Sequence, residues 1–252
     1  YLAALVSFSG LPLPTVTVEF AIWAMVGGLS QILATAFLVY LFSLRNFAVG
    51  TAFSKTDTIQ TAVFGLVVLG EAVSPWATVA ILISLVGVVM LSVTKPAGGL
   101  RSILPQLLEW SALVGLASGA MFGISAISYR AASLSLGDGH FIVRAAFALA
   151  CVTVFQTIVM AIYMRLREPG QLAIVAREWR VAALVGLFGV LGSAGWFTAM
   201  TLQNAAYVRA LGQIELVFTF AITYFYFRER ATRNELIGIL LIAGGILVLV
   251  LS

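Results

Sequence analysis

The sequence predicts an all-α membrane protein that crosses the bilayer several times and contains a duplicated unit. Of its 252 residues, 62% are hydrophobic and 10% are charged, whereas soluble domains carry about 25% charge. Its apolar runs are long and continuous, which favours helices of about 20 residues over barrel strands, whose hydrophobicity alternates. The C-terminal part also repeats an earlier part without a gap. These three observations indicate a helical membrane protein with internal symmetry.

Eight apolar stretches are long enough to form membrane-spanning helices. In chain order they are approximately Ile22–Ser43, Phe47–Gly70, Trp76–Thr94, Trp110–Leu136, Phe141–Met164, Val181–Leu202, Ala205–Phe227 and Leu236–Leu251. Residues Tyr1–Phe8 are similar to the end of a ninth span. Each stretch is therefore predicted to be one continuous helix.

The duplication is visible as matched residues at a constant spacing. Corresponding residues lie 158 positions apart and include Asn46 and Asn204, Ala52 and Ala210, Asp57 and Glu215, Glu71 and Glu229, and Gly87 and Gly245. Even an acid within an apolar span is matched by an acid. Internal duplication in an apolar chain is typical of secondary transporters.

The register of the duplication predicts the domain organisation. We expect a first repeat at residues 1–95, a linker at 96–109 and a second repeat at 110–252. Because the second repeat holds five spans, the expected parent has ten helices, with the first and most of the second preceding Tyr1. Since five is odd, the second repeat would enter the membrane from the opposite side. The expected architecture is thus two inverted five-helix repeats.

Residue counts argue against metal, redox and enzymatic chemistry. Cys151 is the single cysteine and His140 the single histidine of this sequence, which leaves no disulfide pair and no histidine cluster. The sequence also has no Gly-rich phosphate loop and no nucleophile beside a histidine. We therefore expect no metal, no cofactor and no enzyme activity. The net charge of +4 lies mainly at segment ends, which suits a membrane better than a nucleic-acid partner.

Glycines recur at helical spacing in two spans. Gly115, Gly119 and Gly123 are spaced by four residues, and Gly186, Gly189, Gly192 and Gly195 by three. Small residues at such intervals let membrane helices approach closely. We expect close packing at both clusters, with a hinge or thin cavity wall as the alternative for the second.

Charged residues occur inside two predicted spans. Lys55 and Asp57 lie about 14 and 16 Å from the start of theirs at about 1.5 Å per residue, near the bilayer midplane. Glu215 has the corresponding depth in the second repeat. A charge at the bilayer centre costs at least about 2.5–3.5 kcal/mol. These groups should therefore face water, a partner or a substrate.

Polar side chains share one face of each of these two spans at 100° per residue. In the first, this face contains Gly50, Thr51, Ser54, Lys55, Asp57, Thr58 and Thr61. In the second, it contains Gly212, Glu215, Thr219, Thr223 and Tyr226, with Arg209 and Gln213 at its edge. We expect the first face to be a cavity wall and the substrate site to lie between the two faces.

Two interpretations of the charges remain open. In a transport path, Lys55 or Arg209 would bind a substrate carboxylate or phosphate, and Asp57 or Glu215 would accept a proton or a substrate ammonium. Alternatively, Lys55 with Asp57, or Arg209 with Glu215, would be ion pairs that only lock helices together. Further candidates for the path, supplying hydrogen bonds or an aromatic surface, are Tyr40 and Trp196.

Several of these segments resemble the twin EamA domains of the drug/metabolite transporter (DMT) superfamily. The resemblance is carried by Ala52-Phe-Ser-Lys-Thr-Asp57 with Gly70-Glu71 and Gly87-Val-Val-Met-Leu, and by Arg209-Ala-Leu-Gly-Gln-Ile-Glu215 with Glu229 and Gly244-Gly-Ile-Leu. The resemblance covers nearly the whole chain. The sequence departs from the family in lacking the first helix and most of the second. The resemblance implies a ten-helix basket in which the first four helices of each half surround the substrate. It also implies export of amino acids or related metabolites.

The expected function is that of a bacterial inner-membrane carrier, acting as a monomer. It would move a small zwitterionic or anionic metabolite by alternating access, with export of amino acids, aromatic ones included, as the leading case. One alternative is an exporter of cationic drugs or other metabolites, although Lys55 and Arg209 argue against a cationic substrate. Another is a membrane assembly subunit that transports nothing, whose midplane charges would be closed ion pairs.

Overall fold

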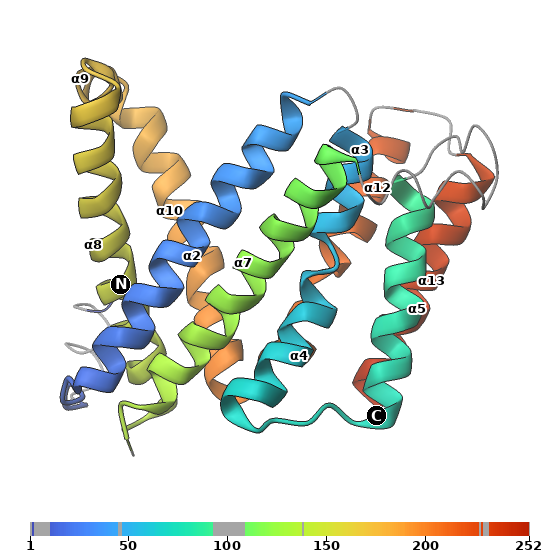
Figure 1. Cartoon of the computed structure of the whole chain (residues 1–252), viewed down its shortest axis with the longest axis horizontal. Coiled ribbons are helices and arrows are strands. Elements are labelled where there is room, and N and C mark those ends of the chain that lie inside the picture. Colours follow the sequence, from blue (N-terminus) through green and yellow to red (C-terminus); the bar gives the residue numbers. More distant parts are fainter. Residues whose placement is uncertain are drawn as a thin grey trace. The chain divides into compact units, whose positions relative to one another are not determined.

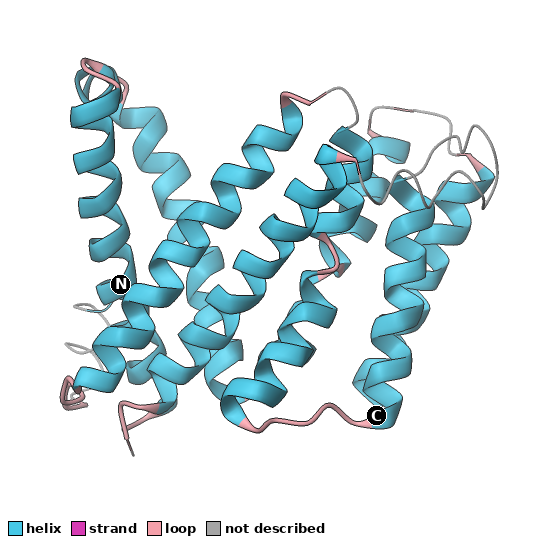
Figure 2. Cartoon of the chain, in the orientation of Figure 1, coloured by secondary structure: helices cyan, strands magenta, loops and turns pink. Residues whose placement is uncertain are grey.

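The fold of the described residues is entirely helical, as predicted (Figure 2). A computed structural model describes residues 2, 11–44, 47–92, 109–137, 139–226, 228 and 232–251. Most of the expected linker at 96–109, and all but residue 2 of the expected N-terminal stump at 1–8, lie outside these ranges.

Within these ranges, eleven helices follow one another (Figure 1). In order they are α2 (Val18–Phe42), α3 (Phe47–Ser54), α4 (Asp57–Leu69), α5 (Pro75–Ser92), α7 (Trp110–Leu134), α8 (Phe141–Arg167), α9 (Gln171–Arg177), α10 (Trp179–Leu202), α11 (Ala205–Gly212), α12 (Ile214–Phe225) and α13 (Arg233–Leu251). The short helix α9, which hydropathy does not predict, is exposed.

Within the described residues, six helical segments are long and apolar enough to cross a membrane. They are α2, α7, α8, α10, the segment Ala205–Ile222 and α13. The sequence predicts eight spans, and the difference has two causes. The expected helix Phe47–Gly70 is interrupted between α3 and α4, so that neither piece is long enough, and the described apolar part of α5 is shorter than a full span.

Helix boundaries follow the sequence duplication. The eight-residue helices α3 and α11 begin at Phe47 and Ala205 and end at Ser54 and Gly212, 158 residues apart at both ends. The last helices of the two repeats, α5 and α13, begin at positions 75 and 233, the same distance apart. Local structure therefore repeats with the sequence.

The chain divides into two compact units. Unit 1 comprises residues 1–32 and 128–203, and unit 2 comprises residues 33–127 and 204–252. Each unit combines segments of both sequence repeats. All the predicted midplane charges belong to unit 2.

In unit 2, α5 and α13 pack closely through one glycine from each helix. A Cβ atom on Gly87 would lie 2.6 Å from the carbonyl oxygen of Gly238, and one on Gly245 would lie 2.8 Å from that of Ala80. In the duplication, Gly87 corresponds to Gly245 and Ala80 to Gly238, each 158 residues apart. Exchanging the two repeats therefore turns the first contact into the second. From Ala80 to Gly87 along α5, the contacted residue of α13 changes from Gly245 to Gly238. The two helices are therefore antiparallel. Such reciprocal contacts are those that a twofold axis between the helices produces.

The glycines of α7 pack against α3 and α4, also within unit 2. A Cβ atom on Gly119 would lie 2.9 Å from the Ser54 carbonyl oxygen, and one on Gly123 would lie 3.2 Å from the Thr61 backbone nitrogen. The prediction of close packing at Gly115, Gly119 and Gly123 is confirmed. By contrast, no described atom lies within 4 Å of a Cβ built on the α10 glycines Gly186, Gly189, Gly192 and Gly195. The prediction that this second cluster packs closely is therefore wrong for the described residues. Its alternative role, as a hinge or thin cavity wall, stays a prediction.

Unit 1 is held together by polar contacts between apolar helices. Gln156 of α8 donates hydrogen bonds to the Gly28 carbonyl of α2 at 3.1 Å and to the Tyr129 hydroxyl of α7 at 3.3 Å. The Tyr129 ring stacks on Phe197 of α10. Arg130 donates to the carbonyl oxygens of Met200 and Gln203 at the end of α10. These bonds satisfy polar groups that would otherwise be costly inside a bilayer.

Candidate functional site

The helix break between α3 and α4 places Lys55 and Thr56 outside regular helix. Ser54 and Thr56 donate their hydroxyls to the carbonyls of Thr51 and Phe53, at 2.8 and 2.7 Å. Such local bonds offer the backbone an alternative to the helical ladder. The Thr56 backbone nitrogen correspondingly bonds Phe53 three residues back. The prediction of one continuous helix at Phe47–Gly70 is therefore wrong, because α3 ends at Ser54 and α4 begins at Asp57.

The second repeat is interrupted at the corresponding place. Gln213, which matches Lys55 in the duplication, separates α11 from α12. Its backbone nitrogen bonds the carbonyl of Ala210, three residues back, at 3.2 Å. Paired helix interruptions in the two halves are a feature of substrate sites in inverted-repeat transporters. Both breaks lie in unit 2.

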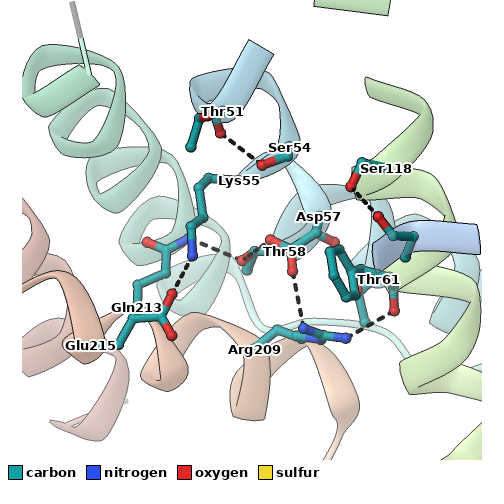
Figure 3. Close-up of polar contacts among 12 residues, drawn as sticks. Thr51, Ser54, Lys55, Asp57, Thr58, Thr61, Ser118, Arg209, Gln213 and Glu215 are labelled. Carbon is teal, nitrogen blue, oxygen red and sulfur yellow. Dashed lines mark hydrogen bonds and ion pairs between the residues drawn. The ribbon is translucent and has the colours of Figure 1, made fainter. Parts of the chain in front are cut away.

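Two ion pairs join the two breaks, as Figure 3 shows. Lys55 contacts the Glu215 carboxylate. Arg209 of α11 contacts Asp57 of α4, with 3.3 Å between Nη1 and Oδ2. Each pair takes its acid from one repeat and its cation from the other. The ion-pair alternative named the wrong partners, because the described ion pairs join the repeats and not residues of one helix.

A hydrogen-bonded chain connects the breaks further. The buried Gln213 donates through Nε2 to the Thr58 hydroxyl at 3.0 Å, and Thr58 donates to Oδ1 of Asp57 at 3.4 Å. In the duplication, Gln213 corresponds to Lys55 and Glu215 to Asp57, so the counterpart of the Lys55–Glu215 contact would join Gln213 to Asp57. Gln213 bonds Thr58, the residue next to Asp57. Nearly corresponding positions of the two repeats are therefore joined, once by an ion pair and once by a neutral hydrogen bond.

The Asp57–Arg209 pair is buried and held from several sides. The Arg209 guanidinium donates to the Phe122 carbonyl at 3.0 Å and lies 5.3 Å from the centre of the Phe122 ring. The side chains of Arg209 and Asp57 are only 16% and 12% exposed. The contact with Phe122 was not predictable from the sequence, since a backbone carbonyl leaves no signal in the residue type. The neighbouring glycines of α7 were the available indication of a close approach.

The Lys55–Glu215 pair has a different environment. The side chain of Lys55 is 28% exposed and that of Glu215 is 56% exposed. Thr219, one turn beyond Glu215, is exposed, and its hydroxyl donates to the Glu215 carbonyl at 2.8 Å. This pair lies at the open edge of the cluster.

Other predicted residues occupy different environments. Ser54, Thr58 and Thr61 are buried, and α7 packs over Ser54 and Thr61, so this part of the expected cavity wall is a packed surface. Tyr40 accepts a hydrogen bond from the Trp110 indole at 3.4 Å. Because Trp110 precedes Gly119 by nine residues, this contact lies about 14 Å along α7 from the ion pairs. Trp196 belongs to α10 in unit 1, and the side chain of Thr223 lies outside the description.

Unit 2 also has an apolar cavity between α4 and α5. Its volume is about 290 Å³, and its walls include Ile59, Leu66 and Ile81. None of its lining residues belongs to the two ion pairs. In the described part of the chain, no group of three or more His, Cys, Asp or Glu residues could hold a metal ion.

Long apolar helices and corresponding helix breaks in the two repeats are features of multi-pass membrane transporters. A model of the EamA-like transporter family matches residues 109–251, more than half of the chain. The chain belongs to the EamA-like transporter family, as the resemblance implies, and thus to the DMT superfamily of membrane transporters.

Comparison with solved structures supports the fold. Among 18 similar chains is one described as "Crystal structure of protein", with a TM-score of 0.59 and 17% identity over 99% of this chain and 91% of that chain. At this identity the likeness concerns the fold alone. No curated protein matches this chain.

Proposed function

We propose that this protein is a secondary transporter of the bacterial inner membrane that exports amino acids or related small metabolites by alternating access. The observation that carries the proposal is the interruption of corresponding helices of the two repeats at Lys55 and Gln213, where charged residues of both repeats meet. Charges at such depth are expensive in a bilayer, and four of them, two acids and two cations, meet within unit 2. Charge placed in this way suits a path for a charged solute.

The proposed mechanism uses two inverted repeats. The reciprocal glycine contacts of α5 and α13 support a twofold axis that passes between the two helices, perpendicular to both. If these helices cross the bilayer, that axis lies in the membrane plane, as in inverted-repeat transporters. Movement of one repeat relative to the other would expose the cluster first to one side and then to the other.

The substrate class follows from the balance of charge. The cluster offers two cations and two carboxylates, which suits a zwitterion better than a purely cationic drug. Amino acids, aromatic ones included, are therefore the proposed substrates. A cationic substrate would have to approach Lys55 and Arg209, whose charges repel it.

Transport of labelled amino acids into liposomes containing the purified protein tests this proposal. We expect saturable uptake by the wild type and a decrease of about ten- to a hundredfold in Glu215→Gln. This corresponds to the loss of a charge-assisted hydrogen bond of about 1.5–3 kcal/mol. Glu235→Gln is the matched control, because Glu235 accepts a hydrogen bond from the Thr232 backbone at the start of α13, a bond that glutamine also accepts.

The control should transport as the wild type does. Uptake of no amino acid by the wild type would refute the proposed substrate class. Uptake that Glu215→Gln leaves unchanged would remove this carboxylate from the transport path and favour a purely structural ion pair.

A further inference from the structure

We infer that the two ion pairs have different roles: Lys55 and Glu215 separate to bind the carboxylate and ammonium of a zwitterionic substrate, whereas Asp57 and Arg209 stay together as a clamp between the repeats. This inference rests on the proposed transport function and assigns the substrate's charged groups within the same site. Sequence analysis left all four charged residues as equal candidates.

Exposure separates the two pairs. The Glu215 side chain is 56% exposed and that of Lys55 is 28% exposed, against 12% and 16% for Asp57 and Arg209. The first pair is therefore the more accessible of the two. Reaching the second pair requires displacement of packed groups around α4 and α11.

The partners of the two cations also differ. The Arg209 guanidinium is shared among the Asp57 carboxylate, the Phe122 carbonyl and the face of the Phe122 ring. Replacing Asp57 by a solute would disturb all of these contacts. Among the described contacts, the Lys55 ammonium donates to Glu215. An ammonium has three donors, so that Lys55 can also donate a hydrogen bond to a substrate carboxylate.

Gln213 supplies a third group for the substrate. It is 4% exposed, and its Oε1 has no hydrogen-bond partner in the described part of the chain, while its Nε2 bonds Thr58. Buried amide oxygens without a donor are uncommon and require an explanation. In Figure 3, the Gln213 side chain extends beside Lys55 and Glu215. We assign Gln213 Oε1, together with Glu215, to the substrate ammonium.

Charge pairing explains why a zwitterion is favoured. A zwitterion that enters between Lys55 and Glu215 replaces one ion pair by two, and no charge loses its partner. An amine without a carboxylate would leave Lys55 unpaired, and an acid without an ammonium would leave Glu215 unpaired. An unpaired charge in a low-dielectric site is unfavourable. The site should therefore discriminate against ligands that lack either group.

The test compares L-phenylalanine with phenethylamine, which lacks the carboxylate, and with 3-phenylpropionate, which lacks the ammonium. Each is used as an inhibitor of labelled phenylalanine uptake in liposomes. We expect the wild type to prefer phenylalanine over each analogue by about tenfold or more, as the loss of one charge-assisted contact implies. Lys55→Gln should reduce the preference over phenethylamine to within about twofold and keep the preference over 3-phenylpropionate. Glu215→Gln should show the opposite pattern.

The double variant Asp57→Asn/Arg209→Gln is the control for the clamp. It should lower the transport rate and leave both preferences unchanged. A preference is a ratio, so it does not depend on how much of a variant folds. If the wild type transports a different amino acid, its own decarboxylated and deaminated analogues replace those of phenylalanine.

Two failures are distinguishable. If the wild type transports a zwitterion but both preferences survive in Lys55→Gln and Glu215→Gln, or change in the clamp variant, the assignment of roles is wrong and the transport function stands. If the wild type transports no zwitterion, the proposed substrate class fails and this inference fails with it.

Discussion

Asp57→Asn is expected to lower the free energy of unfolding by about 3–5 kcal/mol, because it removes one charge of a buried ion pair and leaves the other buried. Arg209 would lose its carboxylate partner while it stays buried against Phe122 of α7. The measurement is equilibrium unfolding in mixed detergent micelles, followed by circular dichroism.

Two controls distinguish pair burial from a general effect of lost charge. The double variant Asp57→Asn/Arg209→Gln should recover part of the loss, since no buried charge then lacks its counterion. Glu215→Gln, the corresponding change in the second repeat, should cost about 1 kcal/mol or less, because the Glu215 side chain is 56% exposed and solvent weakens its pairing. Equal destabilisation by Asp57→Asn and Glu215→Gln would contradict the distinction between a buried clamp and an open pair.

Gly245→Leu is expected to lower the free energy of unfolding by about 3 kcal/mol, as overpacking of a close contact does. A Cβ atom at Gly245 would lie 2.8 Å from the Ala80 carbonyl oxygen, and a backbone atom cannot move aside without shifting α5. Thermal unfolding in detergent, followed by size-exclusion chromatography, measures the loss.

The adjacent residue provides the matched control for this effect. No described atom lies within 4 Å of a Cβ atom built on Gly244, so Gly244→Leu should unfold close to the wild-type temperature. Gly87→Leu should behave as Gly245→Leu does, because the two glycines make reciprocal contacts. Equal tolerance of leucine at 244 and 245 would show that α5 and α13 do not pack as described.

The helical fold was predictable because hydropathy and the duplication report the same pattern. The helices α3 and α11 have the spacing of the sequence repeat, and the α7 glycines mark a close contact. The helix breaks were not predictable in this way. Neither break contains a proline, and hydropathy averaged over a span does not register the hydroxyl-to-carbonyl bonds of Ser54 and Thr56.

The charged residues of the site were predictable, but their partners were not. Depth in the membrane and the repeat single out Lys55, Asp57 and Glu215. The helical wheel assumes one continuous helix, and the break at Lys55 changes the direction of every side chain after it. Pairing also crosses between repeats, and a one-dimensional repeat contains no information on which residues meet across its axis. The transport roles of Tyr40, Thr219 and Trp196 stay predictions.

In the proposed mechanism, the cluster at the two helix breaks opens to each side of the membrane in turn. Thr219→Cys, made with Cys151→Ser to remove the single native cysteine, places a thiol one exposed turn from Glu215. Its reaction rate with a membrane-impermeant thiol reagent is measured from each side of oriented vesicles, with and without a transported amino acid. We predict that the substrate lowers the rate on one side and raises it on the other by several-fold. Rates that are zero from both sides, or that the substrate leaves unchanged, would contradict alternating access at this site.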